Sequence, residues 1–559
     1  MDSSCAVVKG QSHSPLWLTT TVGDVVHNQA TKYGSKDIAV FPWQGVRLSY
    51  AQLAERGELV AKALLRAGVK PTDCVAVLAG NRFEYLEVVV GGALIGCSVL
   101  VLHTTYKPWE LQNALEKTKC RVLFLASSIG SRCMDEHFEI LNTPTARSTL
   151  AGLVRVVRVG DESCSEPSAL NEDYENFLSS AAIEVDSLYE TATQSIHPSD
   201  VASLQFTSVR RNILNNARFV GDNLQLTEDD IICCPPPLFH CFGLVMGFLA
   251  CLIHGCTIVY PTDHFDAGLV LDSIVEEKCT TLYGVPTMFI AELEANQARS
   301  RNIQSLRKGL AAGSTVPLSL MTKLKEQLGI ETMLIAYGMT ETSPVTFMSS
   351  FDDPVEMRVA TVGKIMPHTA AKVIDKMGRV LGRGERGELC TSGYVLQRGY
   401  LDDEEKTTEV MKMDEDGVVW MHTGDEGMID DQGYCRITGR TKDIIIRGGE
   451  NIFPVEIEER LLAHPAIAEV CVVGAPDQKY GEVVGCFLKI SEGAICRPGL
   501  KEIQDWVRPS MGWSRTPQVV FWVGKDGICL DFPKTGSGKH QKHLLRELAA
   551  GHGKTQLAA

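Results

Sequence analysis

The stretch HTGDEGMIDDQGYCRITGRTKDIIIRGGEN, residues 422–451, decides the fold of this chain. It sets an acid, Asp425, behind a tight turn, where the carboxylate can accept hydrogen bonds from a diol such as a ribose. Arg440 follows with a fixed fork of donors for sugar or phosphate oxygens. The pair Gly448-Gly449 lets a ligand or another segment approach the backbone closely. Each residue alone suits a solvated turn equally well, so motifs elsewhere must decide between the two interpretations.

Length and composition favour a soluble globular protein of several folding units. The 559 residues are too many for one core and predict about three or four units. Hydrophobic residues make up 44% and charged residues 22%. A net charge of −15 argues against a nucleic-acid partner or an anionic membrane surface, because both reward a basic face.

Cysteine usage and the termini predict a reducing compartment. The eighteen cysteines are irregularly spaced and form no CxxC pair, which favours scattered buried thiols over a disulfide framework. The N-terminus has no basic segment followed by an apolar core, and the last residues, TQLAA, are not a peroxisomal address. We therefore predict a cytoplasmic protein. A homodimer is compatible with these observations, and nothing in the sequence tests it.

One segment imitates a membrane helix. Residues 241–260, CFGLVMGFLACLIHGCTIVY, contain no Asp, Glu, Lys or Arg. His254-Gly255 interrupts the segment, however, and a β-branched run then ends at Pro261. We predict a buried helix, a turn and a buried strand rather than a membrane span.

Apolar runs alternate with helix-like segments through the first two thirds of the chain, which is typical of α/β layering with buried parallel strands. The predicted strands are 74–80, 98–102, 120–126, 153–159, 201–206, 256–260, 280–283, 310–312 and 332–336. Residues 160–193 are rich in Ser, Glu and Asp and predict a surface excursion.

Two further units follow this α/β region. From residue 371 the strands shorten and the turns become denser, which indicates a β-rich subdomain over 371–441. After Lys442 comes a compact α+β unit, with a helix that begins at Pro454. The predicted division is a large domain, 1–441, and a small one, 442–559.

The motif Tyr337-Gly338-Met339-Thr340-Glu341-Thr342 directly follows a predicted strand, the usual position of ligand sites in open α/β sheets. Tyr337 offers a flat face for a base, Thr340 a hydroxyl for phosphate, and Glu341 a hard oxygen ligand for Mg²⁺. The competing interpretation is a polar turn with a buried tyrosine.

Three other segments carry candidate site residues. Ala311-Ala312-Gly313-Ser314 ends another predicted strand in small residues. The run of three prolines at 235–237 leads to His240, a residue type that is more often structural when it stands alone. Near the C-terminus, PKTGSGK at 533–539 ends in Lys539, whose ammonium is a compact point charge; a mobile basic loop is the alternative.

Together these motifs resemble the adenylate-forming superfamily of acyl-CoA synthetases, aryl-CoA ligases, luciferases and adenylation domains. The resemblance covers residues 25–548. It implies a large multi-subdomain α/β domain with a smaller α+β C-terminal domain. It also implies an ATP-dependent acyl-CoA ligase, which converts a carboxylic acid, ATP and CoA to acyl-CoA, AMP and diphosphate through an acyl-adenylate, with Mg²⁺ accompanying ATP.

The resemblance also assigns roles to residues. Thr340, Glu341 and Lys539 are the catalytic candidates, and Lys539 would support adenylation. For the nucleotide, adenine would bind at Gly313, Tyr337 and Gly338, the ribose at Asp425, and ribose or phosphate at Arg440. Phosphate would also bind at Thr207, Ser208 and Thr340, and magnesium at Glu341. The acyl group would bind at His240 and CoA at Gly448 and Gly449, and Lys442 would be the hinge.

The chain departs from the family pattern after the strand at 201–206. A Gly/Ser/Thr-rich loop whose backbone N–H groups cradle ATP phosphates is expected there. Thr207-Ser208 begins that pattern, Val209-Arg210 interrupts it, and a helix resumes at Arg211, as though about a dozen residues of that phosphate cradle were missing. Two explanations stay open: a coding sequence translated across a wrongly drawn exon boundary, or a real deletion that impairs adenylation.

Three alternatives to the acyl-CoA ligase stay open. A stand-alone adenylation enzyme would load a carrier protein, a luciferase-like oxygenase would emit light, and a non-catalytic relative would bind nucleotide or acyl ligand. The acyl substrate is open as well, among medium-chain fatty acyl, polyketide-like and aryl acids. Its pocket is expected from the segments 239–247 and 283–289.

Overall fold

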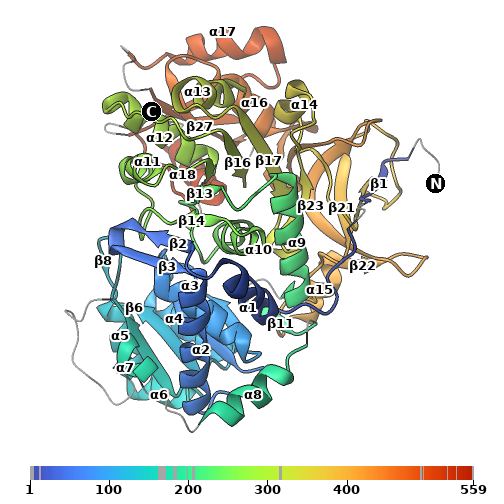
Figure 1. The fold of residues 1–559 in the computed structure, drawn as a ribbon. Helices are drawn as coiled ribbons and strands as arrows, with labels where there is room; N and C mark the ends of the chain where they lie inside the picture. The colour runs from blue at the N-terminus through green and yellow to red at the C-terminus, as the bar shows by residue number, and fades with distance from the viewer. Residues whose placement is uncertain are drawn as a thin grey trace.

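In the computed structural model, four sheets of five or more strands and their covering helices build the chain. The structure describes residues 5–11, 14–160, 171–179, 185–197, 199–203, 208–313, 316, 318–491, 494, 496–524, 527–536 and 538–556. Figure 1 shows the first sheet and its helices at the bottom in blue and teal, and the β-rich sheet on the right. Helix α17 (Leu500–Met511) of the C-terminal unit lies at the top.

The first sheet is parallel except at one edge. Its order is β10 (Asn171–Asp173), β9 (Arg155–Val159), β6 (Val122–Ala126), β4 (Cys74–Leu78), β5 (Ser98–Val101), β11 (Val201–Ser203) and β12 (Ser208–Val209), with β11 and β12 antiparallel. The helices are α1 (Val22–Tyr33), α2 (Tyr50–Arg66), α3 (Phe83–Leu94), α4 (Pro108–Lys117), α5 (Asp135–Asn142), α6 (Pro144–Thr149), α7 (Tyr174–Ser179) and α8 (Asp186–Gln194). The predicted α/β layering is confirmed.

The segment predicted as a surface excursion is part of this layer where it is described. Tyr174 and Phe177 of α7 are buried and lie edge-on to Phe124 of β6, with ring centroids 6.1 and 5.6 Å away. The prediction of a surface excursion was wrong here, because it relied on the polar composition of the whole segment and missed one short helix with an apolar face.

The second sheet contains nine strands and is parallel at its centre. Its order is β19 (Lys364–Ile365), β18 (Val345–Met348), β17 (Thr332–Gly338), β16 (Lys308–Ala312), β15 (Thr281–Gly284), β13 (Ile231–Cys233), β14 (Thr257–Val259), β2 (Asp37–Phe41) and β3 (Val46–Ser49). Successive strand residues pack into different cores: Leu310 with α9 (Arg210–Asn223), and Ala311 with α11 (Ala267–Glu276), α12 (Pro286–Ala298) and α13 (Leu318–Leu328).

The apolar segment 241–260 is a buried helix, a turn and a strand, as predicted. A π-helical stretch, η3 (Phe242–Leu249), continues into α10 (Ala250–His254), and Gly255 turns the chain into β14. Among the described residues, no helix is long and apolar enough to cross a membrane. No disulfide joins the cysteines that the structure describes.

The β-rich subdomain is an antiparallel sheet. Its order is β1 (Val7–Lys9), β20 (Thr369–Ile374), β21 (Gly387–Gly393), β23 (Val419–Ile429) and β22 (Met411–Met413), with β24 (Cys435–Arg440) also paired to β23. The short helices α14 (Val355–Ala360) and α15 (Glu404–Val410) flank it. The N-terminal strand β1 completes one edge although it lies more than 350 residues from β20, a contact that the sequence did not predict.

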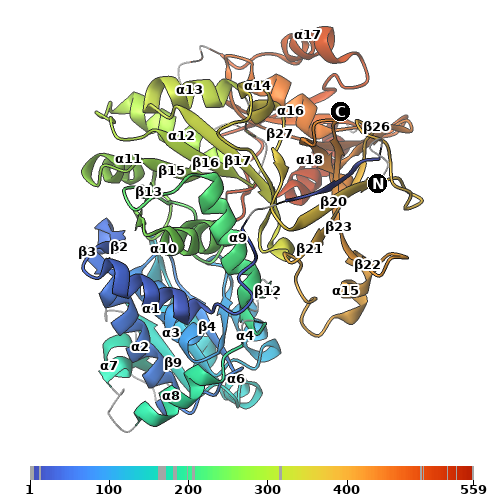
Figure 2. The ribbon, with the colours of Figure 1, turned by 45° about the vertical axis from the view of Figure 1, so that its right-hand side comes forward.

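The C-terminal unit packs helices on both faces of its own sheet. The strand order is β26 (Glu450–Ile452), β25 (Ile445–Arg447), β28 (Gly481–Ile490) and β27 (Ile467–Asp477), with β29 (Val519–Val523) paired to β28. Helices α16 (Pro454–Leu462) and α17 share one core, and α18 (Lys542–Gln556) shares the other. Helix α16 begins at Pro454, as predicted. Figure 2 shows this unit beside the β-rich sheet.

Glu292 is a buried carboxyl group in the core of the second sheet. It lies on α12, its side chain is fully buried, and neither carboxylate oxygen has a hydrogen-bond partner among the residues that the structure describes. Burial raises the pKa of Glu292 from 4.5 to about 8. Between these two pH values the folded protein keeps a proton that the unfolded chain releases, so the free energy of unfolding should fall by about 1.4 kcal/mol per pH unit as the pH rises.

We expect Glu292→Gln to remove this pH dependence, because the amide stays neutral. Thermal unfolding at pH 6 and pH 8.5 should show a gain in Tm over the wild type that is larger at pH 8.5. Glu276→Gln, at an exposed position of α11, is the matched control and should change neither value. An equal gain at both pH values would contradict the burial argument.

Candidate active site

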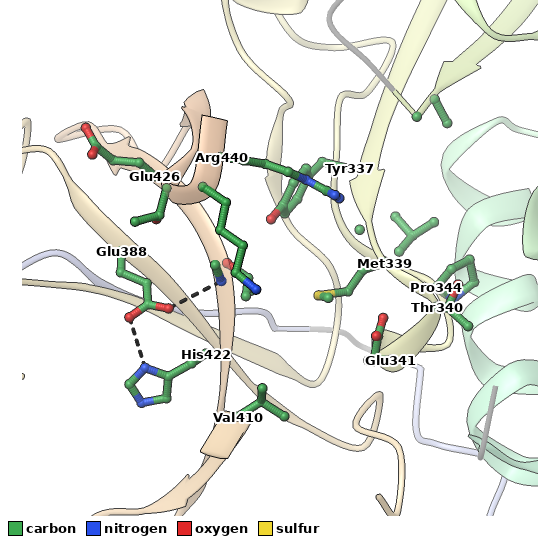
Figure 3. A pocket seen from close by; sticks show the side chains of 18 of the residues that line it. Tyr337, Met339, Thr340, Glu341, Pro344, Glu388, Val410, His422, Glu426 and Arg440 are labelled. Atoms are coloured by element: carbon green, nitrogen blue, oxygen red, sulfur yellow. Dashed lines mark hydrogen bonds and ion pairs between the residues drawn. The ribbon is translucent and has the colours of Figure 1, made fainter. Parts of the chain in front are cut away.

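A cavity of about 1000 Å³ opens at the carboxyl ends of β16 and β17. The β-rich subdomain and the C-terminal unit close its other sides. Figure 3 shows side chains of the β-rich subdomain that face it, among them Glu388, His422 and Glu426. Parallel strands of open α/β sheets place ligands at this edge, so the cavity lies where the fold predicts a site.

The motif after β17 lines this cavity, as the sequence predicts. Tyr337, Gly338, Thr340 and Glu341 all contribute to its wall. A Cβ atom on Gly338 would lie 1.8 Å from the carbonyl oxygen of Pro344, so any larger residue would collide with the backbone there. This close backbone approach explains why residue 338 is a glycine. Thr340 and Glu341, which follow it, face the cavity (Figure 3).

Asp425 lies beside this cavity, between the lining residues Gly424 and Glu426, and not behind a turn. It is inside β23, directly opposite Arg440 of β24, because the tight turn predicted before it is continuous strand. The Tyr337 hydroxyl donates a hydrogen bond to Asp425 Oδ2 at 2.6 Å, and Arg440 Nε lies 3.2 Å from Oδ1. Burial raises the pKa of Asp425, and the Tyr337 hydrogen bond and the Arg440 charge oppose that shift.

Lys539 reaches the same cavity from the C-terminal loop. The loop closes on itself, because the Thr535 N–H donates to the Lys539 carbonyl at 2.7 Å. It also contacts the large domain, where the Thr287 hydroxyl donates to the Gly538 carbonyl at 3.2 Å. A Cβ on Gly313, which has a φ of +89°, would lie 3.1 Å from Lys539 Cε. The lysine stem thus lies against Gly313.

The environment of Lys539 sets its charge. Burial lowers the pKa of the Lys539 ammonium below its ordinary value, while the carboxylates of Asp425 and Glu341 act in the opposite direction. A partly desolvated ammonium group of this kind can strongly stabilise a negative charge that develops in the cavity.

His240 also lines the cavity and is uncharged at neutral pH. Burial, with Lys539 next in effect, lowers the pKa of His240 to about 3. Its Nδ1 accepts a hydrogen bond from the Phe242 N–H at 3.2 Å. Phe242, Met246 and Val285 form an apolar part of the wall nearby, and they come from the two segments that the sequence indicated for an acyl pocket.

Two contacts at the site were missed by the sequence argument. The Tyr400 hydroxyl donates to Glu341 Oε1 at 2.9 Å. Glu388 binds the His422 ring at Nδ1, 3.0 Å away, and accepts from the Gly424 N–H at 3.3 Å, as the dashed lines in Figure 3 mark. The paired residues are 34 to 59 positions apart in the sequence. The alternating pattern of a strand does not show which distant residue a side chain will contact, so the sequence did not predict these pairs.

Other predicted site residues lie elsewhere. Thr207 is outside the described residues, and so is the side chain of Ser208, whose backbone begins β12. Helix α9 begins at Arg210, one residue before the predicted start. Gly448 and Gly449 form the exposed turn between β25 and β26, with φ values of +57° and +90°, and the described residues that line the cavity do not include them.

The predicted hinge residue, Lys442, is exposed in the short turn η5 (Thr441–Asp443) between β24 and β25. Arg546 of α18 donates to the Lys442 carbonyl at 3.2 Å and pairs with Asp443. Across the two units, Arg386 Nη1 lies 3.0 Å from Glu456 Oε1. The Arg386–Glu456 pair thus joins the two units in the orientation in which Lys539 lines the cavity.

Comparison with known proteins identifies the family to which this chain belongs. Residues 26–401 match the family described as AMP-binding enzyme, and residues 456–539 match the AMP-binding enzyme C-terminal domain. The chain belongs to the AMP-binding enzyme family. It is therefore an AMP-forming acid–thiol ligase, for which ATP and CoA are the co-substrates.

Its relatives agree with this placement. The acyl-CoA ligase sidI of Aspergillus fumigatus is 43% identical over 545 residues, which cover 95% of this chain and 92% of the relative. The mitochondrial medium-chain acyl-CoA ligase ACSF2 of Danio rerio is 34% identical over 97% of this chain and 90% of its own length. The crystal structure of the anthranilate CoA ligase AuaEII with anthranoyl-AMP shares the fold, with a TM-score of 0.83 at 23% identity over 97% of this chain and 99% of that one.

Proposed function

We propose that the protein couples a carboxylic acid, in the first place a medium-chain fatty acid or a related secondary-metabolite acid, to CoA through an acyl-adenylate. The observation that carries the proposal is the half-buried Lys539, which lines one cavity with Glu341, Tyr337 and Arg440, the last two of which contact Asp425. The medium-chain preference rests on the apolar wall at Phe242 and Met246 and on the name of the ACSF2 relatives.

In this proposal, ATP binds along the wall of the large domain. Adenine lies against the Tyr337 ring and the backbone at Gly313 and Gly338. The ribose hydroxyls donate to Asp425, whose carboxylate is already oriented by two donors. Arg440 has a mostly exposed side chain, so its guanidinium is free to bind ribose or phosphate oxygens as well.

The site fits a magnesium ion that accompanies ATP. Glu341 offers a hard carboxylate ligand at the cavity wall, and Tyr400 fixes the orientation of that carboxylate through Oε1. Glu341, with Thr340 beside it, would hold the ion, which supplies charge neutralisation for the phosphates.

Adenylation follows from these positions. A carboxylate oxygen of the substrate attacks the α-phosphorus, a new P–O bond forms, and the bond to diphosphate breaks. The Lys539 ammonium can bridge the substrate carboxylate and the α-phosphate while negative charge develops. His240, being neutral, adds no competing charge and contributes to the acyl side of the cavity.

Thioester formation needs a different face of the C-terminal unit. Rotation about Lys442 would withdraw Lys539 and bring the Gly448-Gly449 turn to the cavity, where the small backbone leaves room for the pantetheine arm. The CoA thiol then attacks the acyl carbon, its proton leaves, and AMP departs.

The direct test supplies ATP, Mg²⁺ and a panel containing octanoate, benzoate and a hydroxylated branched acid, with and without CoA. We expect diphosphate release with octanoate and an acyl-CoA product only when CoA is present. Acyl transfer to a carrier protein but not to CoA would support the adenylation-enzyme alternative. AMP binding without diphosphate release for any acid would support the non-catalytic alternative, in which the shortened segment after β11 has abolished adenylation.

Glu388 gives a sharper test of the ribose assignment. Because Glu388 binds the His422 ring and the Gly424 N–H just before Asp425, we expect Glu388→Ala to weaken AMP binding by about five- to tenfold, as for loss of one orienting hydrogen bond. The same substitution should not weaken the binding of 2′,3′-dideoxy-AMP, because this ligand lacks the ribose hydroxyls that would bind Asp425. Calorimetric titration measures both ligands.

The matched control for this titration is Glu405→Ala, at an exposed position of α15. A general loss of structure in Glu388→Ala would weaken both ligands equally, and that result would refute the role of Glu388 in orienting Asp425. Glu388→Gln keeps an acceptor for the Gly424 N–H and should recover part of the AMP affinity.

The compartment and the oligomeric state stay predictions. A cytoplasmic location was predicted from the termini, whereas the ACSF2 relatives are mitochondrial by name. The homodimer has no further support from the contacts of this chain.

A further inference from the structure

Three side chains of the β-rich subdomain bring metal-ligating atoms together at the edge of the cavity. Glu388 and Cys390 are alternate residues of β21, and His422 of β23 lies directly opposite Cys390 in the antiparallel ladder. A carboxylate oxygen, the thiol sulfur and a ring nitrogen of these residues all lie within 4.8 Å of one another. In the described part of the chain, no other group of three His, Cys, Asp or Glu side chains has this spacing.

The sheet itself explains why the three side chains meet. The register between β21 and β23 shifts between Glu388 and Cys390, and an irregularity of this kind re-aims a side chain. Glu388 therefore reaches both the His422 ring and the Gly424 N–H, as the dashed lines in Figure 3 mark. Glu388 and His422 line the cavity, which gives an ion a path to the group.

The ligand types favour zinc and disfavour magnesium. Zn²⁺ binds thiolate, imidazole and carboxylate in tetrahedral sites, whereas a soft thiolate is a poor ligand for Mg²⁺. This chemistry separates the group from Glu341, whose hard carboxylate suits the magnesium of ATP. Three protein ligands leave one tetrahedral position for a water molecule from the cavity.

Burial and charge at this position suit a neutral complex. Cys390 is fully buried, whereas the side chains of Glu388 and His422 are 31% and 19% exposed. Burial raises the pKa of Cys390 to about 12, so the thiol keeps its proton until a metal ion displaces it. One carboxylate and one thiolate then balance the two charges of Zn²⁺, which avoids the cost of a buried net charge.

Metal binding would change the contacts that Glu388 makes now. His422 Nδ1 lies 3.0 Å from Glu388 Oε2, so an ion would take the place of the proton that these atoms share. Ordinary zinc bond lengths hold two ligand atoms about 3.4 to 3.8 Å apart, so the side chains must rearrange around the ion. The longer contact of Glu388, from the Gly424 N–H at 3.3 Å, is the one that this rearrangement weakens.

We infer that Glu388, Cys390 and His422 form a Zn²⁺ site and that zinc bound there inhibits the enzyme. The ion enters from the cavity, the thiol proton passes to solvent, and Glu388 moves away from Gly424. AMP then binds more weakly, because Asp425, the next residue, is less firmly oriented. The zinc site stands on the geometry alone, whereas the inhibition rests on the ribose assignment of the proposed function.

Cobalt tests the site directly, because Co²⁺ accepts the same ligands and absorbs in the near ultraviolet when a thiolate binds it. Titration of the metal-free full-length protein with Co²⁺ should produce this absorption, and added Zn²⁺ should abolish it. Cys390→Ser should remove the absorption. His422→Gln should weaken Co²⁺ binding at least about tenfold, because even the loss of an outer partner of a metal site has that effect.

The matched control is the double variant Cys133→Ser/Cys496→Ser, which removes two exposed cysteines and should keep the cobalt absorption. Absorption of wild-type strength in Cys390→Ser, or its loss in the control, would overturn the site. His422→Gln gives an independent answer if Cys390→Ser does not fold, and far-ultraviolet circular dichroism identifies that case.

Calorimetric titration with AMP, with and without an equivalent of Zn²⁺, tests the inhibition. We expect zinc to weaken AMP binding to the wild type by about five- to tenfold, as for loss of one orienting hydrogen bond, and to leave AMP binding to Cys390→Ser unchanged. An unchanged AMP affinity of the zinc-loaded wild type would refute the inhibition. Absence of AMP binding without zinc would refute the proposed function instead, and the cobalt spectrum would still decide the zinc site.

Discussion

Lys539→Ala should lower the rate of diphosphate release by about two to three orders of magnitude and leave thioester formation from a supplied acyl-adenylate nearly unchanged. The asymmetry follows from where the ammonium lies. It lines the cavity together with Glu341, where the proposed function has it stabilise charge that develops at the α-phosphate. In the proposed second half-reaction the new negative charge develops on the carbonyl oxygen of the acyl group, after rotation has withdrawn the loop that carries Lys539.

Two measurements separate the half-reactions. Diphosphate release with acid and ATP reports the first, and acyl-CoA formation from synthetic octanoyl-adenylate reports the second. Lys534→Ala is the control, because Lys534 lies in the same loop and pairs with Glu469 at 2.7 Å but does not line the cavity. Equal losses in both half-reactions for Lys539→Ala would refute this division of labour.

The conformation described fits adenylation and places the thioester machinery outside the cavity. Lys539 is inside, whereas the Gly448-Gly449 turn is exposed. The Arg386–Glu456 pair between the two units is partly solvated, and single exposed ion pairs contribute little stability. A contact of this kind suits the proposed function, in which the C-terminal unit is released once in each catalytic cycle.

The parts of the fold that were predictable depend on local sequence patterns. Runs such as Cys74–Leu78 are apolar on both faces because helices cover both sides of their sheet, and periodicity reports that directly. Strand β1 and helix α7 were not predicted, because each is short and is buried by segments that lie far away along the chain. Their stability is a property of the assembled layer rather than of the local sequence.

The same distinction applies to the site. Tyr337, Glu341 and Lys539 lie in motifs that are contiguous in sequence, and the structure brings all three to one cavity. Tyr400 and Glu388 carry no such signal, because each acts on a residue at least 34 positions away. Sequence motifs thus located groups that line the cavity, whereas the groups that contact them could be found only from the sheet pairing.

The segment after β11 gives the second large expected effect. Strand β11 ends at Ser203 and β12 begins at Ser208, so the chain passes quickly into α9 where a phosphate-binding loop is expected. A protein that carries about a dozen Gly/Ser/Thr-rich residues between Ser208 and Arg211 should release diphosphate at least about a hundredfold faster than the printed chain, because several backbone N–H donors to the phosphates would be restored.

Sequencing the transcript across residues 205–215 shows which of the two chains the cell makes, and both are then assayed side by side. AMP should bind equally well to both, because Tyr337 and Asp425 hold the nucleoside without this segment. An insert of the same length without glycine is the control, since it adds chain but no nest of N–H donors. Equal diphosphate release from all three proteins would mean that Lys539, Arg440 and the metal ligands suffice for adenylation. The loop would then be dispensable here, and the shortened chain would be an active ligase in its own right.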